Sequence, residues 1–140
     1  MGKKRRVRTV STAEGRRHLV KAEEFVDAAS ASFRAGRFTA SGLESVHAVI
    51  SAADAVTAHS RHEVSSAPDH LEVVHLLRDS LPHGLPAASE RQLVGLLSMK
   101  SEIEYSGVMI GQARAKTMLD QAMRFVVWSR SILDESAARP

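Results

Sequence analysis

The spacing of apolar side chains constrains this chain of 140 residues more than any other feature of its sequence. Through several long segments an apolar residue returns every three or four positions, which places these residues along one side of an α-helix. The clearest of these stripes consists of Leu19, Ala22, Val26, Ala29 and Phe33. No segment shows sustained alternation between apolar and polar residues, so the sequence predicts no β-strand. The expected fold is therefore all-α, a single up-and-down bundle of about five helices.

Capping signals and helix breakers divide these stripes into separate helices. Gly36 marks the end of the first helix, and the second extends from about Thr39 to His62. Pro82 lies in a loop that closes the third helix. Residues 106–111 stay unassigned between a fourth helix and a long final one. Pairs of polar residues three positions apart predict the starts of the first, third and fourth helices, at Ser11 and Glu14, Asp69 and Glu72, and Ser89 and Gln92.

The net charge of +3 is concentrated at the N-terminus. The first ten residues contain no acidic side chain and five basic ones, Lys3, Lys4, Arg5, Arg6 and Arg8. Of the 19 basic residues, the other 14 face 16 acidic residues, so the rest of the chain is slightly acidic. We therefore expect residues 1–10 to form a disordered, flexible tail ahead of a helical domain over residues 11–136. Such a tail binds nucleic acid weakly, through salt-sensitive phosphate contacts that read no bases.

The composition excludes several classes of protein. The chain contains no cysteine, which rules out a disulfide scaffold, a thiolate zinc site and a cysteine nucleophile. It has no apolar run of about 18 residues for a transmembrane helix, and no apolar segment after the basic start for a secretory signal. Gly-rich phosphate loops and the Gly-x-Ser-x-Gly motif of serine hydrolases are missing, so the sequence indicates no cofactor. We expect a cytoplasmic protein without membrane contact.

Two Glu-x-x-His pairs raise the question of a metal site. This spacing places both ligands on one helix face, as in ferritin-like di-iron bundles, which also need a glutamate from each of two further helices. The two pairs fall on consecutive helices of unequal length, so we interpret them as surface neighbours and predict no metal. The candidate ligands are Glu44 with His47 and Glu72 with His75, and the nominal further glutamates are Glu23 and Glu104.

Four segments occur in the order expected of one known family. Phe33–Phe38 resembles the short turn before the second helix of that family, and the Ala-rich segment His47–Ala55 resembles the helix itself. Asp69–Val74 resembles the start of the third helix, and Lys100–Ser106 occupies the place of a segment that often begins with Arg and can contain Tyr or His. Across roughly residues 15–135 the chain thus resembles the HEPN domains, small helical bundles associated with nucleotide and RNA biology.

Many HEPN ribonucleases act on RNA with an Arg that is followed a few residues later by a His. The arginine stabilises charge on the phosphate, while the histidine moves protons near neutral pH. In the corresponding segment this chain has Lys100, Glu104 and Tyr105 but no histidine. The same Arg–His spacing occurs at Arg78 and His83, which straddle a helix end and a proline. We expect these two side chains not to converge, so Arg78, His83, Lys100 and Tyr105 remain candidates without a catalytic set.

The resemblance implies association rather than catalysis. HEPN domains often dimerise, and some pair with nucleotidyltransferases in toxin–antitoxin or defence systems. Alanine-lined helices that allow close packing also favour a homodimer, as do four side chains suited to interfaces, Met109, Met118, Met123 and Trp128. We therefore predict a non-catalytic, HEPN-like interaction module. The alternatives are a HEPN-type RNA-cleaving endoribonuclease and an accessory protein that binds nucleic acid through its basic tail.

Overall fold

The computed structural model describes residues 6–67 and 69–138, and the side chains of this part as far as Glu135. The helices are α1 (Thr12–Arg34), α2 (Phe38–Arg61), α3 (Leu71–Ser80), α4 (Ala87–Tyr105) and α5 (Gln112–Ala138). Two short strands accompany them, β1 (Val7–Thr9) and β2 (Glu63–Ser65). The prediction of an all-α fold with about five helices is confirmed, with this small sheet as an addition that the sequence did not indicate.

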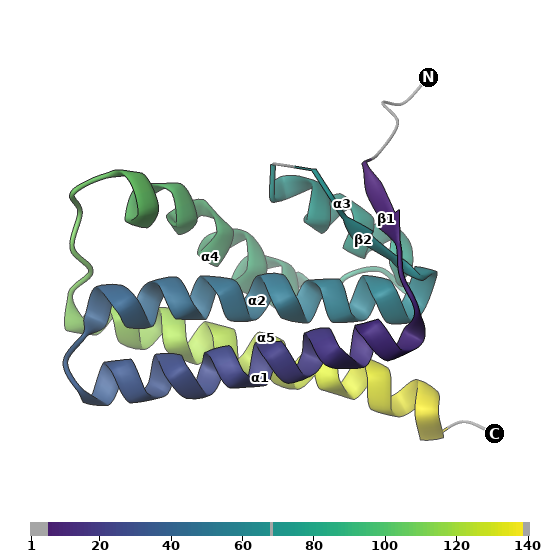
Figure 1. Ribbon diagram of the computed structural model, residues 1–140, viewed down its shortest axis with the longest axis horizontal. Helices are drawn as coiled ribbons and strands as arrows, with labels where there is room; N and C mark the ends of the chain where they lie inside the picture. The colour runs from purple at the N-terminus through teal and green to yellow at the C-terminus, as the bar shows by residue number, and fades with distance from the viewer. Residues whose placement is uncertain (1–5, 68, 139–140) are drawn as a thin grey trace.

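Helix α2 lies at the centre of the molecule and packs against the four other helices. The long helices α1, α2 and α5 run side by side, while the shorter α3 and α4 lie together on another side of α2 (Figure 1). One hydrophobic core joins these helices. Its largest fully buried side chains include Phe125, Leu76, Leu77, Leu93, Leu96 and Leu133.

The small side chains of α2 explain how one helix can contact so many neighbours. Five of its alanines have no exposed surface, namely Ala48, Ala52, Ala53, Ala55 and Ala58. The α1 residue Gly15 comes so close that an added Cβ would lie 3.2 Å from the Cβ of Ala58. Ser41 and Ser45 are also fully buried, and their hydroxyls donate to the backbone carbonyls of Ala29 and of Ser41 itself. Buried hydroxyls are tolerated here because each has such a partner.

The ends of α1 match the sequence signals. The Ser11 hydroxyl accepts a hydrogen bond from the backbone N–H of Glu14 at 3.1 Å, which is the N-cap contact expected of this pair. The Glu14 carboxylate itself contacts Arg8 and His18. At the other end Gly36 has φ +77°, a left-handed conformation that glycine adopts without steric cost. The chain can therefore reverse direction within three residues before α2 begins.

Helix α4 corrects one of the predicted starts. It begins at Ala87 after an N-cap at Pro86, two residues before the expected Ser89, so the prediction of a capping box at Ser89 and Gln92 is wrong. Ser89 instead is buried within the first turn of the helix. Pro86 has no N–H to lose, so a proline at this position starts a helix without cost. At α3 the N-cap is His70, one residue after the expected Asp69, although the Asp69 carboxylate accepts a hydrogen bond from the N–H of Leu71 at 2.9 Å.

The N-terminal segment corrects a second prediction. Residues Val7–Thr9 pair with β2 as an antiparallel strand, with Arg8 opposite Val64, so neither the absence of strands nor a disordered tail up to residue 10 holds for them. Val10 is buried in a small apolar cluster with Ala58 and Val64. Three paired residues are too few to produce an alternating pattern in the sequence, and their partner lies more than 50 residues away.

Candidate functional site

Glu104 lies near three other titratable side chains, which come from three helical elements. Lys100 and Glu104 are one turn apart on α4, and the Lys100 Nζ donates to Glu104 at 2.9 Å. The Nε2 of His47, from the middle of α2, lies 3.9 Å from the other carboxylate oxygen. His70, at the N-cap of α3, is near enough for these charges to act on it. We call His47, His70, Lys100 and Glu104 the Glu104 cluster.

The surroundings of the Glu104 cluster set its protonation. The hydrogen bond from Lys100 holds the pKa of Glu104 below its ordinary value, so the carboxylate is ionised at neutral pH. Burial lowers the pKa of His70, and the positive charge of Lys100 lowers it further, while Glu104 acts in the opposite direction. His70 is therefore neutral at pH 7. The His47 ring stacks on Phe25 of α1, with ring centroids 5.5 Å apart, which fixes its orientation.

A pocket of about 420 Å³ adjoins this cluster, between the start of α3 and α4. Its polar lining includes His70 and Lys100, and its apolar lining includes Leu71, Val94 and Tyr105. These three apolar side chains are also open to solvent, with exposed fractions of 51%, 36% and 82%. In the loop that follows α4, Val108 and Met109 are exposed as well. We call Leu71, Val94 and Tyr105 the α3–α4 surface.

Two of the four residues considered for catalysis thus come together with partners that sequence reasoning missed. Lys100 and Tyr105 line the same pocket as His70, whereas the sequence assigned His70 to no catalytic set. The spacing of Lys100 and Glu104 by four residues was the local signal for their pairing. No local signal connects His47 or His70 to them, because these histidines come from other elements of the fold.

Arg78 and His83 do not share a site. The Arg78 guanidinium donates to the carboxylate of Glu90 on α4. His83 is exposed in the loop between α3 and α4, where it lines a separate pocket of about 340 Å³ beside Trp128. Leu81 ends α3 in an extended conformation before a proline, so the chain turns away from the helix between the two residues.

The two Glu-x-x-His pairs also remain apart. Glu44 accepts a hydrogen bond from the Ser32 hydroxyl of α1 at 2.6 Å, while His47 belongs to the Glu104 cluster. On α3, the side chain of His75 is exposed. In residues 6–67 and 69–138, no group of three or more His, Asp or Glu side chains is placed to hold a metal ion.

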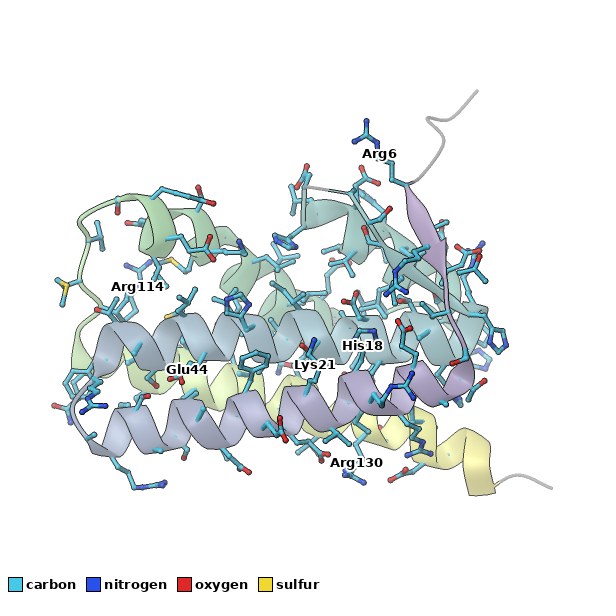
Figure 2. The ribbon with its side chains drawn as sticks, viewed as in Figure 1. Arg6, His18, Lys21, Glu44, Arg114 and Arg130 are labelled. Atoms are coloured by element: carbon cyan, nitrogen blue, oxygen red, sulfur yellow. The ribbon has the colours of Figure 1, made fainter. Side chains whose placement is uncertain are left out.

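The basic N-terminus is only partly described. Lys3, Lys4 and Arg5 lie outside the described residues, and binding of nucleic acid by the tail stays a prediction. Arg6 points away from the helices (Figure 2). The guanidinium of Arg8 instead binds the Glu14 carboxylate, with the closer nitrogen 2.8 Å from the oxygen.

A second charged cluster joins β1, α1 and α2, and the sequence analysis did not anticipate it. Asp54 lies among the buried small residues of α2, and burial raises its pKa to about 7. The positive charges of Lys21 and Arg8 oppose this effect, and the negative charge of Glu14 adds to it. The only local signal was one carboxylate within a run of apolar residues, and the sequence analysis gave no explanation for it.

Comparison with known proteins gives no functional assignment, so the proposed function rests on the candidate site. No protein-family model matches this chain, and no curated protein matches it at a significant level. The resemblance to HEPN domains therefore remains an expectation drawn from the sequence. Among the helices of the described part, none has both the length and the apolar character that crossing a membrane requires.

Proposed function

We propose that this protein is a non-enzymatic helical interaction module that forms a homodimer through the α3–α4 surface. The observation that carries the proposal is the exposure of Tyr105, at 82%, beside exposed Leu71 and a pocket that both residues line. A large exposed aromatic side chain at the edge of a pocket with apolar lining is stabilised when a partner covers it. Aromatic and methionine side chains are enriched in the centres of such interfaces.

The charges around this surface suit a contact between two identical copies. In a twofold dimer the same patch meets itself, so an acidic group of one copy faces a basic group of the other only where both signs are present. The pocket supplies both, because Lys100 and Asp69 line it together. Its neutral imidazole, His70, adds no charge that the interface must bury at pH 7.

The resemblance to HEPN domains supports the same assignment. That family often dimerises, and a nucleotidyltransferase partner in a toxin–antitoxin or defence system is the biological setting that we propose on this ground. The proposed self-association is supported by the geometry of the α3–α4 surface, independently of the resemblance to HEPN domains.

Light scattering across a concentration series tests the dimer. We expect a mass of twice 15.2 kDa for the wild type. Tyr105→Ser and Leu71→Ser should shift the equilibrium to the monomer. Val127→Ser and Val20→Ser are matched controls, because these valines are 69% and 55% exposed on α5 and α1 and should leave the dimer intact. A wild type that stays monomeric up to roughly millimolar concentration, or a dimer that only the controls disrupt, would contradict the proposal.

Cleavage of RNA is the second candidate, and one observation favours it. His70 lines the same pocket as Lys100, and the Nε2 of His47 lies 3.9 Å from Glu104, so imidazole groups and a cation occur around the segment that lacked a histidine. Such a pair can move a proton and stabilise a charged phosphate.

An RNA cleavage assay decides whether this second candidate is right. If it is, His70→Ala and Lys100→Ala abolish cleavage. Arg78→Ala and His83→Ala are the controls, and they leave cleavage unchanged because these residues do not line the pocket. If the purified wild type cleaves no RNA, the candidate is excluded and the interaction module remains.

A further inference from the structure

The short strand β1 presents one free edge. The backbone groups of every second residue in this segment are hydrogen-bonded to the chain at β2. The Val10 N–H donates to the carbonyl of His62 at 2.8 Å, and the Ser66 N–H donates to the carbonyl of Arg6 at 3.0 Å. With Arg8 opposite Val64, the same alternation directs the backbone of Arg8 to β2. The N–H and C=O groups of Val7 and Thr9 therefore point away from the sheet.

Within residues 6–67 and 69–138, no element covers the outer edge of β1. All three residues of β1 are exposed, and the strand packs against β2, which in turn contacts α2 and α3. β1 lies at the outside of this sheet (Figure 1). An open row of backbone donors and acceptors is the element that an extended peptide uses when it adds a strand to a sheet.

The edge is also held in place before any partner arrives. Below it, Val10 is buried against Ala58 and Val64, and Arg8 is bound to Glu14 of α1. A strand fixed in this way loses little conformational entropy when a third strand joins it, so more of the free energy of the new hydrogen bonds is available for binding.

The charge of the N-terminal segment selects the kind of partner. Residues 1–10 contain five basic side chains and no acidic one, and of these five Arg8 is bound to Glu14 of α1. A second copy of β1 would bring the same charges together, which disfavours pairing between two copies at this edge. A nucleic acid would satisfy the charges but has no backbone donors and acceptors at the spacing of a strand. We propose that the free edge of β1 binds an acidic, extended peptide segment of a partner protein as a third strand.

A synthetic peptide tests this proposal directly. The probe is a labelled peptide of about ten residues in which Glu alternates with Val, and its binding to the full chain is followed by fluorescence anisotropy at low salt. The first comparator has the same sequence with N-methyl groups on the amides of one edge, which keeps the charge and removes the strand hydrogen bonds. The second is a single-stranded RNA of equal charge. We expect the methylated peptide and the RNA to bind at least about tenfold more weakly.

Variants of the chain locate the edge. Val7→Pro and Thr9→Pro each remove an N–H that points outward, and they leave the hydrogen bonds to β2 in place because edge strands tolerate proline in this orientation. Val7→Ala and Thr9→Ala keep the N–H and serve as matched controls. Circular dichroism verifies that all four variants are folded. We expect only the proline variants to lose binding, and hydrogen exchange to show new protection at Val7 and Thr9 in the wild type with peptide.

Each other result would overturn the proposal. Equal binding of the methylated peptide shows that charge alone acts, and tighter binding of RNA with no effect of the proline variants assigns the segment to nucleic acid. Absence of peptide binding at low salt excludes strand addition at this edge. The test is independent of the dimer, since Tyr105→Ser alters the α3–α4 surface and should bind the peptide as the wild type does.

Discussion

The guanidinium of Arg8 holds the carboxylate of Glu14 through both terminal nitrogens, at 2.8 and 3.4 Å. The pair joins β1 to the first turn of α1, where the Glu14 N–H is also bonded to the Ser11 hydroxyl. The same carboxylate lies 3.2 Å from the Nε2 of His18. Glu14 thus connects the N-terminal strand and the next turn of the helix through its carboxylate, and the helix cap through its backbone N–H.

Removing this contact should free β1 without unfolding the helices. We expect Arg8→Ala to speed hydrogen exchange at the backbone N–H groups of Arg8 and Val10, which bond to β2, because one of the two anchors of the strand is lost. The pair is exposed, so the midpoint of thermal unfolding should change little. Arg17→Ala is the control, because it removes an exposed arginine of α1 that takes no part in this contact. Unchanged exchange in Arg8→Ala would show that Val10 alone holds the strand.

Stability should depend on pH through Asp54. In the unfolded chain this carboxyl ionises near pH 4, whereas burial raises its pKa in the folded protein to about 7. Between these values only the folded state holds the proton, so the free energy of unfolding falls as pH rises through this window. Asp54→Asn should remove that dependence and raise the stability at pH 8 by up to about 4 kcal/mol.

Urea unfolding at pH 5 and pH 8 measures the effect of Asp54. Asp27→Asn, which changes an exposed carboxylate of α1, is the control and should leave the dependence of the wild type intact. A wild type as stable at pH 8 as its Asp54→Asn variant would mean that Arg8 and Lys21 compensate the buried charge fully.

Alanine substitutions at Gly15 and Gly42 should have different effects on stability. Gly15 of α1 faces α2, and Gly42 lies within α2. At Gly42 the nearest atoms to an added Cβ are the flexible end of Met118, at 3.3 Å, which can shift. Gly42→Ala should therefore stabilise the protein by up to about 1 kcal/mol through helix propensity. At Gly15 the neighbours are the Cβ of Ala58 and the backbone of Ala55, at 3.2 and 3.4 Å. Gly15→Ala must push α1 away, so in urea unfolding it should be less stable than Gly42→Ala by about 1 kcal/mol or more.

The titration of His70 reports the geometry of the Glu104 cluster. Burial and Lys100 lower its pKa, and Glu104 raises it. Glu104→Gln should therefore lower the pKa of His70 further, while Lys100→Met should raise it. NMR titration of the imidazole resonances measures both. An unchanged pKa of His70 in both variants would place it outside the influence of these two charges.

The parts of the fold that were predictable are those that local sequence encodes. The stripe that ends at Phe33 and the reversal at Gly36 require only neighbouring residues, and the structure ends α1 at Arg34. The sequence also predicted the end of α2 near His62. In the structure Arg61 is the last helical residue, and His62 follows it with φ 56°. Two local signals compete at the start of α4. The prediction used Ser89 as the N-cap, whereas the structure has Pro86 there.

The candidate site was predictable only in part. Lys100 and Tyr105 stood out because of their place in one segment, and their spacing from Glu104 followed from the helix period. The meeting with His47 and His70 did not, because 30 or more residues separate each histidine from Lys100 and a bundle can bring any two helices together. Arg78 and His83 are five positions apart, and their separation in space was predictable, because a helix end and a proline lie between them.

By itself the sequence determined the helices of this protein, because the period of 3.6 residues and the breakers act over a few positions of the chain. The tertiary structure decided which side chains meet. Arg130 of α5 binds Glu23 of α1 across 107 positions, and β1 pairs with β2 although α1 and α2 separate them in the sequence. Such contacts depend on how helices pack, which the small side chains of α2 permit at close range. The Glu104 cluster, the α3–α4 surface and the free edge of β1 all arise at that level.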